Sequence, residues 1–182
     1  MNIKLLTINF LVAVLLFVLP LLSNAQEKQI FTLTADNLAN GKTAELNEAG
    51  WKYHAGDDGV WANSNFDDAG WETLKNSAMT KDSLPQTGWN GSGWLRLRLN
   101  VAPALVNVPL NLEAAHLGAS EIYLDGKLIK RYGSIGNTAA TEEPYNPNAE
   151  PFAVAFDGAG EHLLAVRYSN KAAADFNSGY GK

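Results

Sequence analysis

The sequence predicts an all-β domain, a β-sandwich of jelly-roll type. Short apolar or alternating runs follow one another from Phe31 onward, and Gly, Asn, Asp and Pro separate them. A long stretch with helical periodicity is missing from this part of the sequence. Asp125-Gly126 lies between two β-forming runs, as in a hairpin with a two-residue type I′ turn. Many short strands joined by turns are typical of sandwiches and jelly rolls.

The strands are expected where β-forming residues alternate or cluster between turn residues. In chain order we expect them at 31–34, 43–46, 51–54, 94–101, 108–114, 121–124, 127–131, 152–156 and 162–169. A single helical turn is expected at 65–70, where Asn65 can cap the following amides.

Two of these strands show strict alternation. The run 94–101 has Leu95, Leu97, Leu99 and Val101 on one side of the strand, and Trp94, Arg96, Arg98 and Asn100 on the other. The run 162–169 similarly divides into Leu164, Val166 and Tyr168 on one side, and Leu163, Ala165 and Arg167 on the other. Period-two alternation predicts strands with one buried face.

The less regular segments set the expected domain boundaries. Region 133–150 is a long polar loop with Pro144 and Pro147, and loops of this length are usually functional or disordered. We expect residues 26–42 to form an N-terminal strand and linker, residues 43–170 the jelly-roll domain, and residues 171–182 a tail. Because the tail lacks a strong β pattern, we interpret it as the end of a truncated reading frame.

Residues 1–25 are expected to be a signal peptide. Lys4 precedes an apolar run from Leu5 to Leu22, and Ser23-Asn24-Ala25 offers the small residues of a cleavage site. A membrane anchor is the alternative, because the run approaches the roughly 18–20 residues that span a bilayer. The lack of a following basic cluster favours cleavage near Ala25. The protein is therefore expected to be exported, to the periplasm or the cell exterior.

Composition narrows the classes of partner and chemistry. The net charge is −5 and the pI about 5.1, and no basic patch occurs, so nucleic acid is not an expected partner. The sequence has no cysteine, which excludes disulfides, thiolate metal sites and a cysteine nucleophile. No metal or other cofactor is predicted.

Catalytic motifs are lacking in the sequence. His54, His116 and His162 show no metal-ligand spacing, and no GxSxG nucleophile elbow occurs. Adjacent acids such as Glu142 and Glu143 point apart on a strand. Glycoside hydrolysis instead needs two acids that face each other about 5–10 Å apart. We therefore expect a non-catalytic protein.

The GDDG sequence at 56–59 has two explanations. Asp57, Asp58 and nearby carbonyls are oxygen ligands of the kind that calcium prefers. The spacing does not match an EF-hand loop, however, and Asp and Gly also favour tight turns. The turn is the favoured explanation.

Aromatic rings beside charged groups suggest a sugar-binding site. The apolar face of a sugar ring packs on an aromatic ring, and its hydroxyls bond to Arg, Asp and Asn side chains. The candidate ligand contacts are Asp57, Asp58, Trp61, Trp89, Arg96, Arg98 and Tyr145.

Several of these aromatic and basic residues also have a structural explanation. Trp51 and Trp71 start expected strands, so we expect them in the core. Trp61 lies in a loop rich in Gly and Asn, as does Trp89, and both core and ligand contact remain open for each. Arginines on the outer face of a strand are usually solvated or paired with acids of a neighbouring strand.

The order of several short motifs resembles a known domain family. The motifs are WKY at 51–53, GDDGVWA at 56–62, FDDAGW at 66–71, LPQTGW at 84–89, GSGWLRLRLNV at 91–101, EIYLDGKLI at 121–129 and HLLAVRYSN at 162–170. Over roughly 43–170 this order resembles the galactose-binding-like jelly-roll domain. One version is the amino-terminal sugar-binding domain of family-two glycoside hydrolases. Another is the exported input domain of bacterial membrane signalling proteins, including sensor histidine kinases and phosphatases.

The resemblance implies a binding module and suggests its context. The block 56–71 is similar to the signalling version, whereas LPQTGW lacks the His-Asp of the hydrolase version. We therefore expect a periplasmic input domain that binds a carbohydrate or another small polar ligand, with membrane signalling domains downstream. The alternatives are the amino-terminal fragment of a family-two hydrolase, with hydrolase domains downstream, and a stand-alone secreted lectin-like protein. FDDAGW and LDG are implied to be structural, as a turn that buries Trp71 and as a hairpin.

Overall fold

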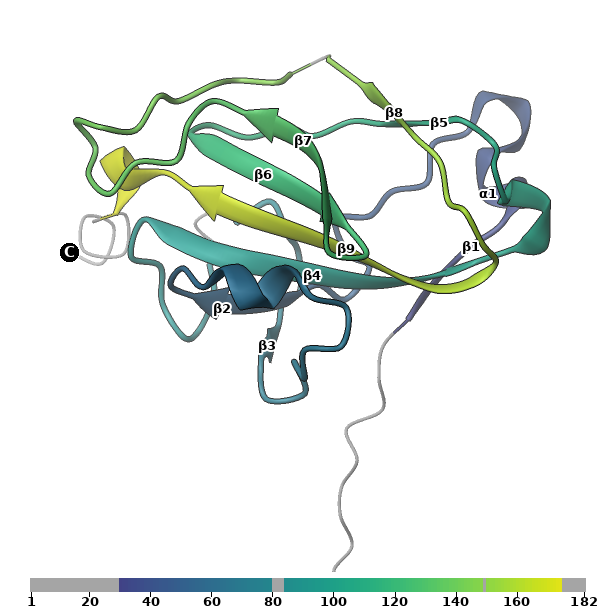
Figure 1. The fold of residues 1–182 in the computed structure, drawn as a ribbon, viewed down its shortest axis with the longest axis horizontal. Coiled ribbons are helices and arrows are strands. Elements are labelled where there is room, and N and C mark those ends of the chain that lie inside the picture. Colours follow the sequence, from purple (N-terminus) through teal and green to yellow (C-terminus); the bar gives the residue numbers. More distant parts are fainter. Residues whose placement is uncertain (1–29, 80–83, 149, 175–182) are drawn as a thin grey trace, which may run out of the picture.

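The computed structural model describes residues 30–79, 84–148 and 150–174 and is an all-β sandwich (Figure 1). Its strands are β1 (Phe31–Leu33), β2 (Lys52–Ala55), β3 (Glu72–Thr73), β4 (Ser92–Val101), β5 (Leu110–Leu112), β6 (Ala119–Leu124), β7 (Lys127–Tyr132), β8 (Phe152–Val154) and β9 (Gly160–Ser169). Short helical turns lie between the strands, namely α1 (Ala35–Leu38), η1 (Ala39–Gly41), η2 (Gly59–Ala62) and η4 (Pro103–Leu105), and η5 (Lys171–Ala173) follows β9. The predicted fold class is confirmed. The signal peptide expected at 1–25 lies outside the described residues.

Strands β4 and β9 form the centre of the larger sheet. Its order is β3-β2-β4-β9-β6-β7, and β1 also pairs with β4. The β4–β9 ladder is antiparallel and runs from the pair Ser92–Ser169 to the pair Val101–Gly160. Strand β2 pairs with the first half of β4, and β1 lies parallel to its last three residues. The strand expected near residue 31 is therefore part of the main sheet.

The β6–β7 hairpin has the turn that the sequence predicts. Asp125 and Gly126 have φ angles of 50° and 82°, and both φ values are positive in a type I′ turn. Gly tolerates this backbone region without a steric cost, and Asp tolerates it better than most residues. The LDG motif is structural, as expected.

The main core lies between the larger sheet and a second layer, which contains the antiparallel pair β5–β8 (Figure 1). Its buried residues include Leu33, Trp51, Tyr53, Leu74, Trp89, Leu95, Leu97, Leu99, Val101, Leu105, Ile122, Tyr132, Phe156 and Leu164. The leucines of β4 that alternate in the sequence all point into this core. Trp51 is buried here, as predicted.

Part of the opposite face of the sheet is also buried, which the alternation in β4 does not predict. Trp94 and Arg96 are 0% and 1% exposed, although they point away from the main core. A smaller cluster covers them, made of Ala62, Trp71, Leu163 and Ala165 with Trp61, Phe66 and Tyr123 around it. The expectation of one buried face was wrong for β4, because the connection between β2 and β3 folds back over the sheet.

Two local expectations were also wrong. Residues 43–46 form no strand, although Ala44 and Leu46 pack against the main core. Their alternation therefore reflects packing of an irregular segment that has no neighbouring strand to pair with. The helical turn expected at 65–70 is absent, and η2 lies a few residues earlier instead.

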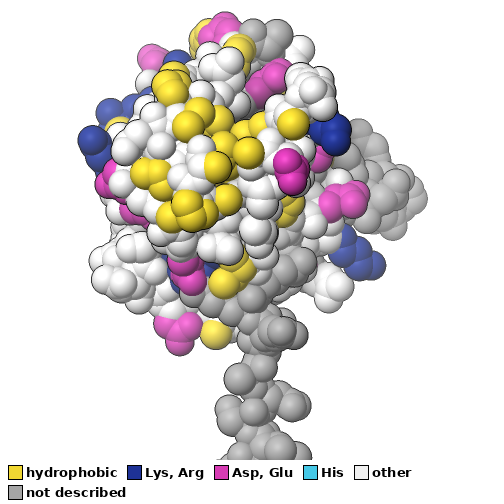
Figure 2. Space-filling model, turned by 90° about the vertical axis from the view of Figure 1, so that its right-hand side faces the viewer, with side chains coloured by type: hydrophobic (Ala, Val, Ile, Leu, Met, Phe, Trp, Pro, Cys, Tyr) yellow, Lys and Arg dark blue, Asp and Glu magenta, His cyan; other side chains and the backbone are white. Residues whose placement is uncertain are grey.

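One end of the sandwich, where α1 and η4 lie, has a mostly uncharged surface (Figure 2). Hydrophobic side chains gather near the middle of this view, and charged side chains lie nearer its rim. None of the predicted ligand contacts belongs to α1 or η4. Among the described residues, no helix has both the length and the apolar character to cross a membrane.

Candidate functional site

Arg96 fastens the β2–β3 connection to the sheet. Its Nε donates to Oδ2 of Asp68 over 2.7 Å, and the two residues form a buried ion pair. Its terminal nitrogens donate to the backbone carbonyls of Trp61, Asn63 and Phe66. Burial raises the pKa of Asp68, but the hydrogen bond from Arg96 and the charges of Arg96 and Arg98 outweigh it and lower that pKa overall. The structure therefore places Arg96 inside the protein as a clamp, away from solvent.

Arg98 extends the same ion-pair cluster toward the surface. Its Nη2 lies 3.3 Å from Oδ1 of Asp68, and its Nη1 lies 3.1 Å from Oε1 of Glu161 on the neighbouring strand β9. Pairing with an acid of a neighbouring strand was one of the two structural explanations above, and it is confirmed for Arg98. Arg96 instead pairs with Asp68 of the β2–β3 connection.

Asp57 belongs to a second row of charges. Both of its carboxylate oxygens accept from Arg167 of β9, over 2.6 and 2.5 Å. Arg167 also donates to Glu121 of β6, which accepts in turn from Arg131 of β7. The hydrogen bond from Arg167 is the main cause that lowers the pKa of Asp57. This row of ion pairs links the GDDG segment to strands β9, β6 and β7.

Asp58 and Trp61 build the turn that follows. Oδ1 of Asp58 accepts from the amide of Val60 over 3.0 Å and caps η2. Trp61, on η2, is half-buried and meets the rings of Trp71 and Trp94 edge-on. The exposed ring of His54 also contacts it, with ring centroids 4.8 Å apart. Trp61 is therefore mainly a packing residue with one open side.

Trp89 lies in the main core. It is 7% exposed, and its ring stacks on Tyr168 with the centroids 5.3 Å apart. Its indole Nε1 donates to the carbonyl of Ala173 over 3.1 Å. Of the two explanations left open for Trp89, the structure supports burial.

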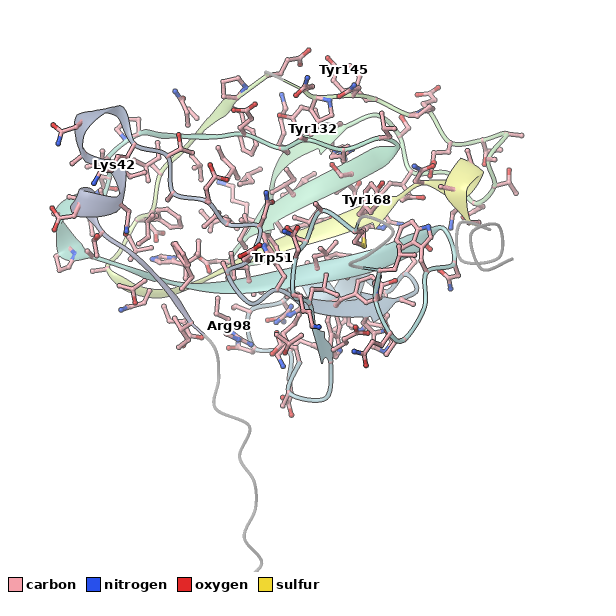
Figure 3. All side chains as sticks on the ribbon, turned by 180° about the vertical axis from the view of Figure 1, so that it is seen from behind. Lys42, Trp51, Arg98, Tyr132, Tyr145 and Tyr168 are labelled. Atoms are coloured by element: carbon pink, nitrogen blue, oxygen red, sulfur yellow. The ribbon has the colours of Figure 1, made fainter. Side chains whose placement is uncertain are left out.

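Tyr145 is the predicted contact that lines an open groove. The groove, called the Tyr145 groove below, has a volume of about 460 Å³ and is lined by Leu117, Gly118, Pro144, Tyr145, Asn146, Asn170, Ala172 and Ala173. Leu117 and Tyr145 are 65% and 41% exposed. Figure 3 shows Tyr145 at the outer edge of the molecule, with Tyr132, the last residue of β7, on its inner side. The two rings are stacked at 14°, so one face of Tyr145 rests on protein.

Buried contacts hold the walls of this groove. Glu142, which is 8% exposed, accepts from the amide of Lys171 over 2.8 Å and from the hydroxyl of Ser169. The amide of Tyr145 donates to the carbonyl of Gly118 over 2.7 Å. Gly118 has a φ of 103°, and a Cβ there would lie 2.2 Å from the carbonyl of Ser169, so only glycine fits. Loop 133–150 is thus fixed against the ends of β6 and β9.

The hydroxyl of Tyr145 is also fixed. It donates to both carboxylate oxygens of Glu150 over 2.8 Å each, and this hydrogen bond raises the pKa of the phenol. The hydroxyl of Tyr132 donates to the carbonyl of Glu150 over 2.9 Å. The stacked pair is therefore held in one orientation.

Sequence reasoning missed most of the Tyr145 groove. Leu117, Asn146 and Asn170 are ordinary surface residue types from separate segments. The length of loop 133–150 was the one signal that pointed to this region. The other predicted contacts lie elsewhere, so the seven residues do not form one site.

A second groove, of about 520 Å³, lies near the start of the described chain. It is lined by Ile30, Phe31, Glu45, Asn47, Glu48, Ala49 and Asn76. Its one aromatic residue, Phe31, packs against the main core. Within the described part of the chain, no three His, Cys, Asp or Glu side chains cluster so as to hold a metal ion.

Comparison with known proteins identifies structures but no sequence family. No protein-family model and no curated protein matches the chain. A β-glucuronidase of Bacteroides uniformis shares 27% identity over 66% of this chain, with a TM-score of 0.42. A glycoside hydrolase family 2 member of Bacteroides cellulosilyticus shares 18% identity over 66%, with a TM-score of 0.43. A further family 2 β-glucuronidase shares 16% over 69%, with a TM-score of 0.45.

The chain resembles a galactose-binding-like domain, as its motifs predict. The similar solved structures are family 2 glycoside hydrolases, the group that carries one version of that domain. The chain spans 14% of the length of the Bacteroides uniformis enzyme, 13% of the second β-glucuronidase and 17% of the Bacteroides cellulosilyticus protein.

Proposed function

We propose that this chain is an exported, non-catalytic carbohydrate-binding module, of the type found at the amino terminus of family 2 glycoside hydrolases. The observation that carries the proposal is the Tyr145 ring. One of its faces rests on Tyr132, and the residue remains 41% exposed in a groove bordered by Leu117 and Pro144. An immobilised aromatic ring with an open side provides a flat apolar surface at little cost in conformational entropy.

The composition of the groove suits a sugar. Tyr145, Leu117 and Pro144 provide apolar surface for the C–H groups of a pyranose ring. Asn146 and Asn170 add amide groups that can bond to hydroxyls. Small-molecule sites typically combine such a mostly apolar lining with a few polar groups.

A binding role without catalysis fits the same lining. Hydrolysis of glycosides requires two carboxyl groups about 5–9.5 Å apart across the bound sugar. None of the described residues that line the Tyr145 groove is Asp, Glu or His. The groove lining itself thus supplies no pair of carboxyl groups for hydrolysis.

The proposal relates the chain to family 2 glycoside hydrolases, in place of the membrane signalling sensors expected from the sequence. None of the three similar structures described above is a membrane signalling protein, and the sensor interpretation gains no support from them. Export remains part of the proposal because of the leader-like residues 1–25. It is tested by cell fractionation, with an amino terminus at Gln26 expected in the exported protein.

Glycan-array screening followed by calorimetry tests the binding function. Purified protein should bind at least one class of glycan, and Tyr145→Ala should abolish that binding while the melting temperature stays nearly unchanged. Val60→Ala serves as the matched surface control, because Val60 is 50% exposed on η2 and outside the groove. Glycan binding that persists in Tyr145→Ala would contradict the assignment of the groove.

A further inference from the structure

The charges around the Tyr145 groove are distributed unevenly. Its eight lining residues, all within the described chain, are uncharged. A ligand that carries its own charge would therefore meet no direct ion-pair partner on the groove wall. The charges that it does meet come from the residues just outside the lining.

The nearest lysine in the sequence points elsewhere. Lys171 lies between two lining residues, but its Nζ donates to the hydroxyl of Ser92 over 3.0 Å. Its charge also acts on Asp57, which belongs to the ion-pair row with Arg167. The ammonium of Lys130 lies 4.8 Å from the ring centroid of Tyr132 and 5.8 Å from that of Phe152. Both ammonium groups are thus engaged by protein groups that do not line the groove.

Three carboxylates, in contrast, belong to the loop that carries Tyr145. Glu143 immediately precedes Pro144, is exposed and accepts from the hydroxyl of Ser134, and Glu142 lies buried beside it. Glu150 bonds directly to the Tyr145 hydroxyl through both of its oxygens. A second carboxylate brought here by a ligand would be repelled, and it would lose water without gaining a cationic partner.

We propose that the Tyr145 groove selects neutral sugars and rejects sugars that carry a carboxylate. The inference rests on the proposed carbohydrate-binding function and adds the class of ligand. It also distinguishes this groove from a site for glucuronides, which a likeness to β-glucuronidases would suggest.

The test compares matched ligands that differ only at C6. Short oligosaccharides of the gluco, galacto and manno series are titrated with the purified protein by calorimetry, each as the neutral sugar and as the corresponding uronate. In the series that binds, the neutral form is expected to bind at least about tenfold more tightly. Added salt should narrow this difference, because it screens the repulsion between carboxylates.

A charge introduced at the groove gives the converse test. Ala172 lines the groove and is exposed, so Ala172→Arg places a guanidinium at its edge without removing a side-chain hydrogen bond. This variant should bind the uronate more tightly than the unmodified protein does. Ala172→Gln, the neutral control, should leave the preference for neutral sugars unchanged.

The outcomes separate the two proposals. Equal or tighter binding of the uronate by the unmodified protein overturns the selectivity but leaves the binding function intact. Unchanged uronate affinity in Ala172→Arg also counts against the selectivity. Absence of binding for every sugar, neutral and acidic, overturns both.

Discussion

The imidazole Nδ1 of His162 lies 2.7 Å from Oδ2 of Asp125, the turn residue of the β6–β7 hairpin. The other oxygen of this carboxylate accepts from the amide of Leu163, and Nε2 of His162 lies 2.9 Å from the carbonyl of Gly158. Both ring nitrogens thus face acceptors, so the doubly protonated cation makes both hydrogen bonds at once. His162 links the hairpin turn to the loop before β9.

This contact predicts a dependence of stability on pH. Burial alone lowers the pKa of His162, but the hydrogen bond to Asp125, the bond to Gly158 and the charge of Asp157 raise it overall. Since the folded-state pKa is raised, the stabilisation is complete below the unfolded value of about 6.5 and is lost as the pH rises through the folded value. Urea unfolding between pH 5 and pH 9, roughly spanning the titration of histidine, measures this loss.

His162→Gln should remove this part of the pH dependence. The variant is compared with the unmodified protein at each pH, because His116, whose pKa is lowered by burial, contributes a change of opposite sign. If the two proteins lose stability in parallel above pH 6, His162 is not the group responsible.

Removal of the clamp should destabilise the domain strongly. Asp68→Ala leaves the guanidinium of Arg96 buried without its carboxylate and should cost about 3–5 kcal/mol of unfolding free energy. Asp67→Asn is the matched control. Within the described part of the chain, the Asp67 side chain accepts from the nearby amide of Ala69, and asparagine can do the same. A loss of stability below about 1 kcal/mol in Asp68→Ala would show that the clamp is not a major support of the fold.

Trp61→Ala should affect folding rather than ligand binding. The ring packs against Trp71 and Trp94, so its removal should cost about 3 kcal/mol, near the lower end for a tryptophan. Thermal unfolding measures the loss, and calorimetry with the best ligand measures affinity at a temperature where the variant remains folded. A large loss of affinity with little change in stability would instead make Trp61 a ligand contact.

Glu142→Gln should loosen the loop that carries Tyr145. The substitution keeps the shape of the side chain but removes the charge that accepts from Ser169 and Lys171, and charge-assisted hydrogen bonds contribute about 1.5–3 kcal/mol. Amide exchange of Tyr145 and Lys171 should accelerate, and ligand affinity should fall with it. Glu143→Gln, at the exposed neighbouring position, should leave both amides protected.

The strand pattern was readable from the sequence because alternation and turn residues act locally. The β4 and β9 runs and the Asp125-Gly126 turn follow from period-two spacing and from backbone preference. The burial of Arg96 does not follow from such a pattern. Alternation tells which side chains share a face, but it does not tell whether another segment will cover that face.

The candidate site was less predictable for a similar reason. All seven predicted contacts carry chemistry that suits a sugar, yet in six of them it is used within the protein, as in the pair Asp57–Arg167. The Tyr145 groove forms where three segments meet, namely 117–118, 144–146 and 170–173. Nothing in their individual composition marks them as a site, since the groove depends on the fold that brings them together.

The β4–β9 ladder also determines when this domain can fold during synthesis. Residues 92–101 at the centre of the sheet pair with residues 160–169, which the ribosome adds much later. Until that last strand emerges, the leucines of β4 lack their central neighbours, and pairing across such a distance in sequence is slow. The sandwich can therefore close only after residues 160–169 have been synthesised.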